Sequence, residues 1–186
     1  MKRLALAAVL MVLLTGCMDK DDSLDRAMGL RAKLLAGDGC SFDARITADY
    51  GEGLNTFSVT CTSDSKGNVT FSVTEPETIT GITGTISDEG GKLTFDDQAL
   101  AFPLLADGQV TPVSAPWLLV KTLRGGYLTA CGKDGEQLRV SIDDSYADDA
   151  LHLDIWLGGS DLPVRAEILY KDRRILSLEI KNFQIL

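Results

Sequence analysis

The sequence predicts a mainly β (α+β) protein, in which a large curved antiparallel sheet of about 10–11 strands is covered on its concave face by two or three helices. Three observations lead to this prediction. Apolar and polar residues alternate with a period of two through most of the chain after residue 40. Short turns rich in Gly, Asp and Asn separate these stretches, which favours neighbouring hairpins over parallel units. Only two stretches have the spacing of a helix in a folded domain.

The first sixteen residues, MKRLALAAVLMVLLTG, have a basic start and an apolar run from Leu4 to Leu14. This run is too short for a transmembrane helix, which needs roughly 20 apolar residues. Segment 1–16 is therefore typical of a secretory signal peptide. Its end, Leu14-Thr15-Gly16-Cys17, resembles a bacterial lipobox, although an ordinary signal peptide with a chance cysteine is the alternative.

The lipobox resemblance implies that Cys17 carries the lipid attachment and becomes the first residue of the mature chain. Two or three acyl chains on one residue give stable membrane attachment. We therefore expect residues 17–22 to form a lipidated tether and residues 23–186 a single domain. The expected location is extracytoplasmic, lipid-anchored to a bacterial membrane.

The domain begins with a helical pattern and then changes to strands. In residues 22–36 apolar side chains recur at helical spacing, acidic residues crowd the start and Gly37 follows the end. From Cys40 onward, Phe42, Ala44 and Ile46 alternate with polar residues, as in a half-buried strand. Similar alternation follows at residues 56–62, 69–74, 82–86, 92–95 and 98–105.

A second helical pattern interrupts the strands at residues 114–124. Ser114 is a suitable cap, Pro116 suits the first turn and Gly125-Gly126 ends the pattern. Strand patterns then return at residues 127–131, 136–143, 150–157, 163–170 and 174–185. Each strand has one apolar face, which must be covered, and the two helices are the only elements that can cover it.

The charge of the chain excludes one class of partner. There are 18 Lys and Arg against 27 Asp and Glu, and loss of Lys2 and Arg3 with the leader changes the net charge from −9 to −11. So acidic a domain is repelled by nucleic acid and by anionic lipid headgroups. We therefore expect no nucleic-acid partner.

The three cysteines after Cys17 form neither a zinc motif nor a redox motif. If Cys40 and Cys61 lie on one hairpin that turns near residue 53, position 61 faces position 45. Cys40 is then offset by about 16 Å along the strand, beyond the ~7 Å Cα limit for a disulfide. We therefore expect either a bridge that uses Cys131, with Cys61 as its partner, or three buried thiols.

The C-terminal third resembles the closing strands of the lipoprotein-carrier superfamily, with its LolA/LolB-like fold. The matching features are an apolar-x-apolar strand end at Ile155-Trp156-Leu157, an opening Leu162-Pro163, a charged turn at Lys171-Asp172 and a final Asn182-Phe183. The resemblance implies an incomplete antiparallel barrel of about eleven strands closed by a few helices. It also implies a space for acyl chains between the sheet and the helices.

By this resemblance, the apolar faces of the first three strands line the expected cavity, and Trp117 on the second helix is a candidate lid over it. The candidate lining residues are Phe42, Ile46, Phe57, Val59, Phe71, Val73 and Trp117. The alternative is that the same side chains are a solid core and that Trp117 anchors its helix to the sheet.

No catalytic or metal-binding constellation is evident. His152, the only histidine, alternates away from the apolar residues of its strand and has no GxSxG or comparable nucleophile motif beside it. The acidic turn IDDSYADD lacks the spacing of a calcium-binding loop, so we expect a solvated hairpin turn. We expect a non-enzymatic protein without cofactor or metal.

The sequence leaves two main hypotheses of function. The first is a membrane-anchored extracytoplasmic lipoprotein that binds or shelters a hydrophobic ligand, such as an acyl chain, a lipid or a lipoprotein, between sheet and helices. The alternative is a structural or interaction module of the cell envelope, with a filled core and a protein partner. Either is expected to be a monomer held at the membrane through Cys17.

Overall fold

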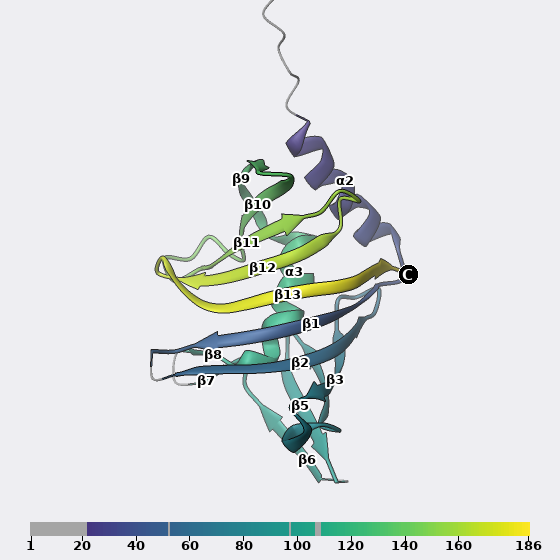
Figure 1. Cartoon of the computed structure of the whole chain (residues 1–186), viewed down its shortest axis with the longest axis vertical. Helices are drawn as coiled ribbons and strands as arrows, with labels where there is room; N and C mark the ends of the chain where they lie inside the picture. The colour runs from purple at the N-terminus through teal and green to yellow at the C-terminus, as the bar shows by residue number, and fades with distance from the viewer. Residues whose placement is uncertain (1–21, 52, 97, 107–108) are drawn as a thin grey trace, which may run out of the picture.

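One antiparallel sheet of eleven strands dominates the computed structural model, which describes residues 22–51, 53–96, 98–106 and 109–186. The strands lie in the order β6-β5-β4-β3-β2-β1-β13-β12-β11-β10-β9 (Figure 1). In chain order the first six are β1 (Cys40–Asp49), β2 (Leu54–Ser63), β3 (Val69–Glu75), β4 (Thr83–Ser87), β5 (Gly90–Phe95) and β6 (Gln98–Phe102). The other five are β9 (Tyr127–Asp134), β10 (Gln137–Asp143), β11 (Leu151–Leu157), β12 (Pro163–Tyr170) and β13 (Arg173–Ile185). The predicted fold class is confirmed.

The sheet consists of two meanders that meet at one seam. Strands β1 to β6 are neighbours in chain order, and so are strands β9 to β13. The halves join where β1 pairs with β13, from Cys40 opposite Ile185 to Ala48 opposite Leu176. This seam brings residues far apart in the chain to the middle of the sheet.

Two α-helices accompany the sheet, α2 (Ser23–Ala36) and α3 (Ala115–Gly125). Helix α3 contacts β2, β3 and β10, which lie on either side of the seam, so the sheet curves around it. Figure 1 shows α3 against this concave face and α2 beside the end of the sheet formed by β9. Eight of the eleven residues of α3 are buried, and four of the fourteen of α2. None of the helices in the described residues has the length and apolarity needed to cross a membrane.

The hydrophobic core lies between the concave face and α3. The burial pattern of β1 alternates as the sequence predicted, with Phe42, Ala44 and Ile46 inward. In β11, Leu153 and Ile155 point to the same core. A period-two pattern buries one side of each strand, so the opposite, convex side carries the polar residues. We call this side the outer face.

Some local elements were not predicted. Strands β7 (Leu105–Ala106) and β8 (Gln109–Val110) form a separate two-stranded sheet. Single 3-10 turns occur at Glu77–Ile79 and Pro112–Ser114. These elements have too few residues for a recognisable period.

The β1–β2 hairpin differs in register from the prediction. Cys61 lies opposite Phe42, not opposite position 45, because β2 begins at Leu54 and the turn is centred earlier than expected. The register of a hairpin depends on the geometry of its turn. The alternation of side chains shows which face each residue occupies but does not fix that geometry.

The structure corrects the expected disulfide between Cys61 and Cys131. Five strands separate β2, which carries Cys61, from β9, which carries Cys131. In the described part of the chain, Cys40, Cys61 and Cys131 do not bridge one another. Cys40 and Cys61 are buried thiols, whereas Cys131 is half-buried. The predicted signal peptide, Cys17 and most of the tether lie outside the described residues.

Candidate functional site

The residues expected to line a cavity are packed in the core. Phe42, Ile46, Val59, Phe71, Val73 and Trp117 are buried, and Phe57 is half-buried against them. The ring of Phe42 stacks on Phe183 of β13, with 5.3 Å between the ring centroids. Trp117 anchors α3, and the ammonium of Lys121 lies 4.6 Å from the centre of its ring. This part of the concave face is filled by its own side chains.

A small apolar cavity lies instead under α2. Its volume is about 10 Å³. The helix contributes Ala27, Met28 and Leu30 to its lining, and strands β9, β10 and β11 contribute Leu128, Val140, Ile142 and Leu157. We call this space the α2 crevice. Its walls are mainly apolar side chains from two helices and three strands that meet only in the folded molecule.

Three arginines connect α2 to the rest of the domain, and one of them, Arg31, lines the crevice. The Nε of Arg31 donates a hydrogen bond of 2.8 Å to the carbonyl of Leu123 at the end of α3. Arg124 of α3 donates in return to the carbonyl of Leu34. The third contact is an ion pair of 2.6 Å between Arg26 and Asp161, which raises the pKa of the Arg26 guanidinium.

Arg31 differs from the exposed arginines because its guanidinium is partly buried. Burial lowers the pKa of its guanidinium, which is also one of the groups lining the crevice. Its two acceptors are the main-chain carbonyls of Leu123 and Thr122, at the C-terminal end of α3, where the helix dipole favours a cation. Arg31 thus holds α2 to α3 by a polar contact at the edge of an apolar space.

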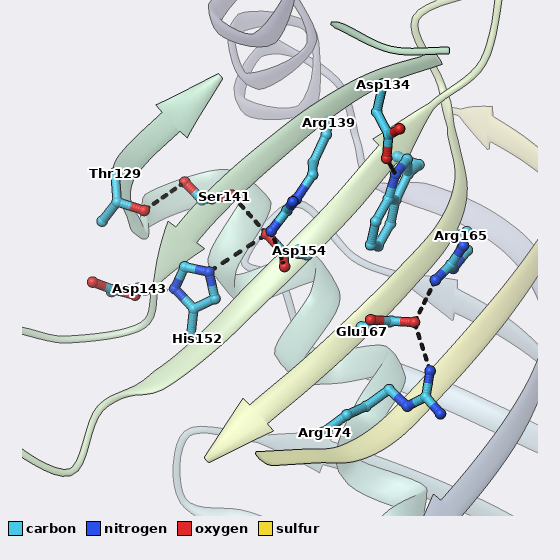
Figure 2. A network of polar contacts seen from close by, with 11 residues as sticks. Thr129, Asp134, Arg139, Ser141, Asp143, His152, Asp154, Arg165, Glu167 and Arg174 are labelled. Carbon is cyan, nitrogen blue, oxygen red and sulfur yellow. Dashed lines mark hydrogen bonds and ion pairs between the residues drawn. The ribbon is translucent and has the colours of Figure 1, made fainter. Parts of the chain in front are cut away.

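The outer face of β10 and β11 carries a buried carboxylate, Asp154 (Figure 2). Arg139 donates to both of its oxygens, at 3.0 and 2.6 Å, and the hydroxyl of Ser141 donates to Oδ1 at 2.6 Å. Burial alone would raise the pKa of this carboxyl, but the hydrogen bonds from Arg139 and Ser141 outweigh it and hold the pKa below its ordinary value. The carboxylate is therefore ionised and fully bonded, as buried charges usually are.

His152 lies beside this carboxylate on the same face, as its alternation predicted. Its Nδ1 is 2.7 Å from Asp143 and its Nε2 is 3.4 Å from Asp154. The hydroxyl of Ser141 is bonded to the carboxylate of Asp154 and not to the imidazole. A serine nucleophile needs a base positioned to take its proton, so this group of side chains is arranged as a structural network.

The network continues onto β12 and β13. Glu167 accepts from both Arg165 and Arg174, and these bonds hold the pKa of its carboxyl low against the opposing effect of burial. Trp156 lies under the guanidinium of Arg165, which is 4.2 Å from its ring centre, and donates its indole N–H to Asp134 (Figure 2). Satisfied polar networks of this kind make a structure rigid. The polar network on the outer face therefore stabilises the strands whose inner face lines the α2 crevice.

The lining residues predicted from the sequence lie on β1 to β3 and α3, whereas the α2 crevice is lined by residues of α2, α3 and β9 to β11. Val140 and Ile142 of β10 alternate with their neighbours in the same way as Phe42 and Ile46 of β1. What was missing was the place of α2, which follows from the order of the strands and not from the period of any of them. In the described residues, no cluster of three or more His, Cys, Asp or Glu is placed to hold a metal ion.

Comparisons with known proteins show likeness at the level of structure. No protein-family model matches the chain, and no curated protein matches its sequence. A LolA superfamily protein from Nitrosomonas europaea is 10% identical, with a TM-score of 0.44 over 86% of this chain and 93% of that one. A putative outer membrane lipoprotein-sorting protein domain from Vibrio parahaemolyticus is 11% identical, with a TM-score of 0.47 over 88% and 92%. Lipoprotein LppX from Mycobacterium tuberculosis is 12% identical, with a TM-score of 0.41 over 87% and 92%. The superfamily that the C-terminal third resembles is therefore among the solved structures similar to this chain.

Proposed function

We propose that this chain is a membrane-anchored extracytoplasmic lipoprotein that binds a hydrophobic ligand between α2 and the concave face of the sheet. The pattern Leu14-Thr15-Gly16-Cys17 supports lipid attachment at Cys17. The apolar α2 crevice supports the binding of an acyl chain or a similarly apolar group. The protein holds its ligand by burial and does no chemistry on it.

The observation that carries this proposal is the apolar α2 crevice, which α2 covers. A cavity of about 10 Å³ is far smaller than the ~300–1,000 Å³ of ordinary ligand sites, so a ligand enters only when α2 moves outward. Helix α2 buries four of its fourteen residues, against eight of eleven for α3, and three arginines add polar contacts to this packing. Elements with few buried apolar contacts are the ones that open at low free-energy cost.

The residues predicted to line the cavity have a place in this proposal. Displacement of α2 extends the apolar surface of the crevice towards α3, whose Leu123 borders it. From there the core formed by Trp117, Phe42 and Phe71 becomes the floor of a larger space. These side chains therefore rearrange around a bound chain and are not a preformed pocket.

The experiment is native mass spectrometry of residues 22–186, beside organic extraction of the same sample after incubation with membrane lipids. We expect a reproducible added mass that extracts as lipid. A clean ligand-free mass after this incubation contradicts the proposal. The alternative, an interaction module with a filled core, then accounts for the fold.

A matched pair of variants connects the ligand to α2. Arg31→Gln removes one of the two arginine charges that connect α2 and α3. We expect it to speed uptake of the fluorescent probe N-phenylnaphthylamine about tenfold, as the loss of one charge-assisted hydrogen bond implies. Arg45→Gln changes an exposed arginine on the outer face and is the control. Equal uptake rates in both variants would place the ligand away from α2.

A further inference from the structure

One flank of α2, next to its buried side, is unexpectedly apolar. Leu24, Met28 and Leu35 are 52%, 46% and 55% exposed, and they are three of the nine exposed large hydrophobic side chains in the described residues. At 3.6 residues per turn they fall within about 40° of one another around the helix axis. We call them the α2 stripe. The stripe is distinct from the buried side of the helix, which carries Ala27 and Leu34.

The position of the stripe in the chain suggests what covers it. Helix α2 begins at Ser23, six residues after Cys17. Six residues span at most ~20 Å when fully extended, so a lipid on Cys17 keeps the start of α2 close to the bilayer. The α2 stripe is then close enough to the bilayer surface to contact it.

Basic side chains lie at the far end of the stripe. Leu35 borders a surface pocket of about 260 Å³ whose lining includes Lys66, Lys121 and Arg124, together with one carboxylate, Asp88. Lys121 pairs with Asp88 at 3.2 Å, and both side chains remain exposed. In a chain whose net charge is −9, this local excess of cations is a place where anionic headgroups are not repelled.

We propose that the α2 stripe lies on the surface of the membrane that holds Cys17, with the basic end of the helix at the headgroups. This proposal rests on the lipid attachment proposed above. Helices with one apolar side commonly lie in the interface in this way. A second copy of the chain fits less well, because three half-exposed side chains offer far less than the ~800 Å² per partner of a stable protein interface.

The placement gives the crevice access to lipid. Met28 belongs to both features: it is 46% exposed in the stripe and it also lines the α2 crevice. With the stripe on the bilayer, the edge of the crevice at Met28 faces the acyl region, and an acyl chain passes from membrane to protein without crossing water.

Methyl NMR of the mature lipidated chain tests this directly. After residue 16 the chain has two methionines, Met18 and Met28, so labelling methionine methyl groups with carbon-13 gives two signals. The protein is placed in discs of phosphatidylcholine and phosphatidylglycerol containing a gadolinium-chelate lipid. We expect strong broadening of both signals, and equal broadening of the added methyl in the Leu35→Met variant, ~16 Å farther along the helix than Leu24.

A variant with a polar stripe distinguishes contact of α2 with the bilayer from tethering through Cys17 alone. In Leu24→Ser/Leu35→Ser we expect Met28 to recover more than half of its signal while Met18 stays broadened. Unchanged broadening of Met28 in this variant, or sharp Met28 and Leu35→Met signals in the discs, overturns the α2 proposal but leaves the anchor intact. A sharp Met18 signal shows instead that the chain is not anchored at Cys17. Signals that change with protein concentration and not with gadolinium identify a second copy as the occupant.

Discussion

Asp154 shows how one residue stabilises a whole region of the sheet. It is the one buried carboxylate in the described residues, and it receives three hydrogen bonds from the side chains of Arg139 and Ser141. Removing one partner of a buried charge pair is costly because the other partner loses its compensation. Here Arg139 is half-exposed, so water recovers part of that cost.

Asp154→Asn is therefore expected to lower the free energy of unfolding by about 2 kcal/mol at neutral pH, the scale of hydrogen bonds to a charged group. Urea unfolding followed by circular dichroism measures the change. Asp148→Asn, in the exposed 144–150 turn, is the control and is expected to change stability by less than about 0.5 kcal/mol. Equal effects of the two substitutions would mean that the network contributes nothing specific.

The loss of stability in Asp154→Asn is expected to depend on pH. The folded-state pKa of Asp154 lies below its ordinary 3.8, so its contribution to stability is complete above that value and is lost as the pH falls through the folded pKa. The difference in unfolding free energy between the wild type and Asp154→Asn should thus be constant above about pH 5 and shrink below pH 4. A difference that grows on acidification would contradict the assigned direction of the pKa.

At the scale of elements, Gly84 determines how β3 and β4 pack. It lies opposite Phe71, whose ring covers the space that a side chain would occupy. A Cβ at Gly84 would be 2.5 Å from Cζ of Phe71 and 2.8 Å from the carbonyl oxygen of Lys92. Neither neighbour can move freely, because the ring is 2% exposed and the carbonyl belongs to β5.

We expect Gly84→Ala to destabilise the protein by about 2 kcal/mol through overpacking. Gly159→Ala is the control, since nothing lies within 4 Å of the added Cβ. Adding Phe71→Leu to Gly84→Ala should recover part of the loss, which thermal unfolding of the two single variants and the double variant would show. Additive losses would mean that the ring is not the obstacle.

The elements themselves were largely predictable, and their partners were not. The alternation of apolar and polar residues in CSFDARITAD or PVRAEILY predicts a strand, because side chains along a strand have a period of two. It says nothing of which strand comes next to it in space. For this reason the sequence placed both helices over the sheet but could not place α2 on β9 to β11, where the crevice lies.

At the scale of the whole molecule, the seam between β1 and β13 joins the two meanders. Phe183 of β13 is 7% exposed and stacks on Phe42 of β1. We expect Phe183→Ala to lower the free energy of unfolding by about 3 kcal/mol, as for other buried aromatic side chains. Gln184→Ala, at the exposed next position, is the control and should cost less than about 0.5 kcal/mol.

Both variants are compared by urea titration, which also reports cooperativity. A single transition with an unchanged slope in Phe183→Ala means that the two meanders unfold together. Two separate transitions would show that the halves are independent units, and the seam would then be a contact between them and not the centre of one core.

The seam also sets the timing of folding. Strand β13 comes after all the others in chain order, yet it lies between β1 and β12. During folding, β1 and β12 therefore each keep one open edge until residues 173–185 pair with them. Such late closure of distant contacts is slow, so two open strand edges remain in the middle of the sheet until β13 pairs with both of them.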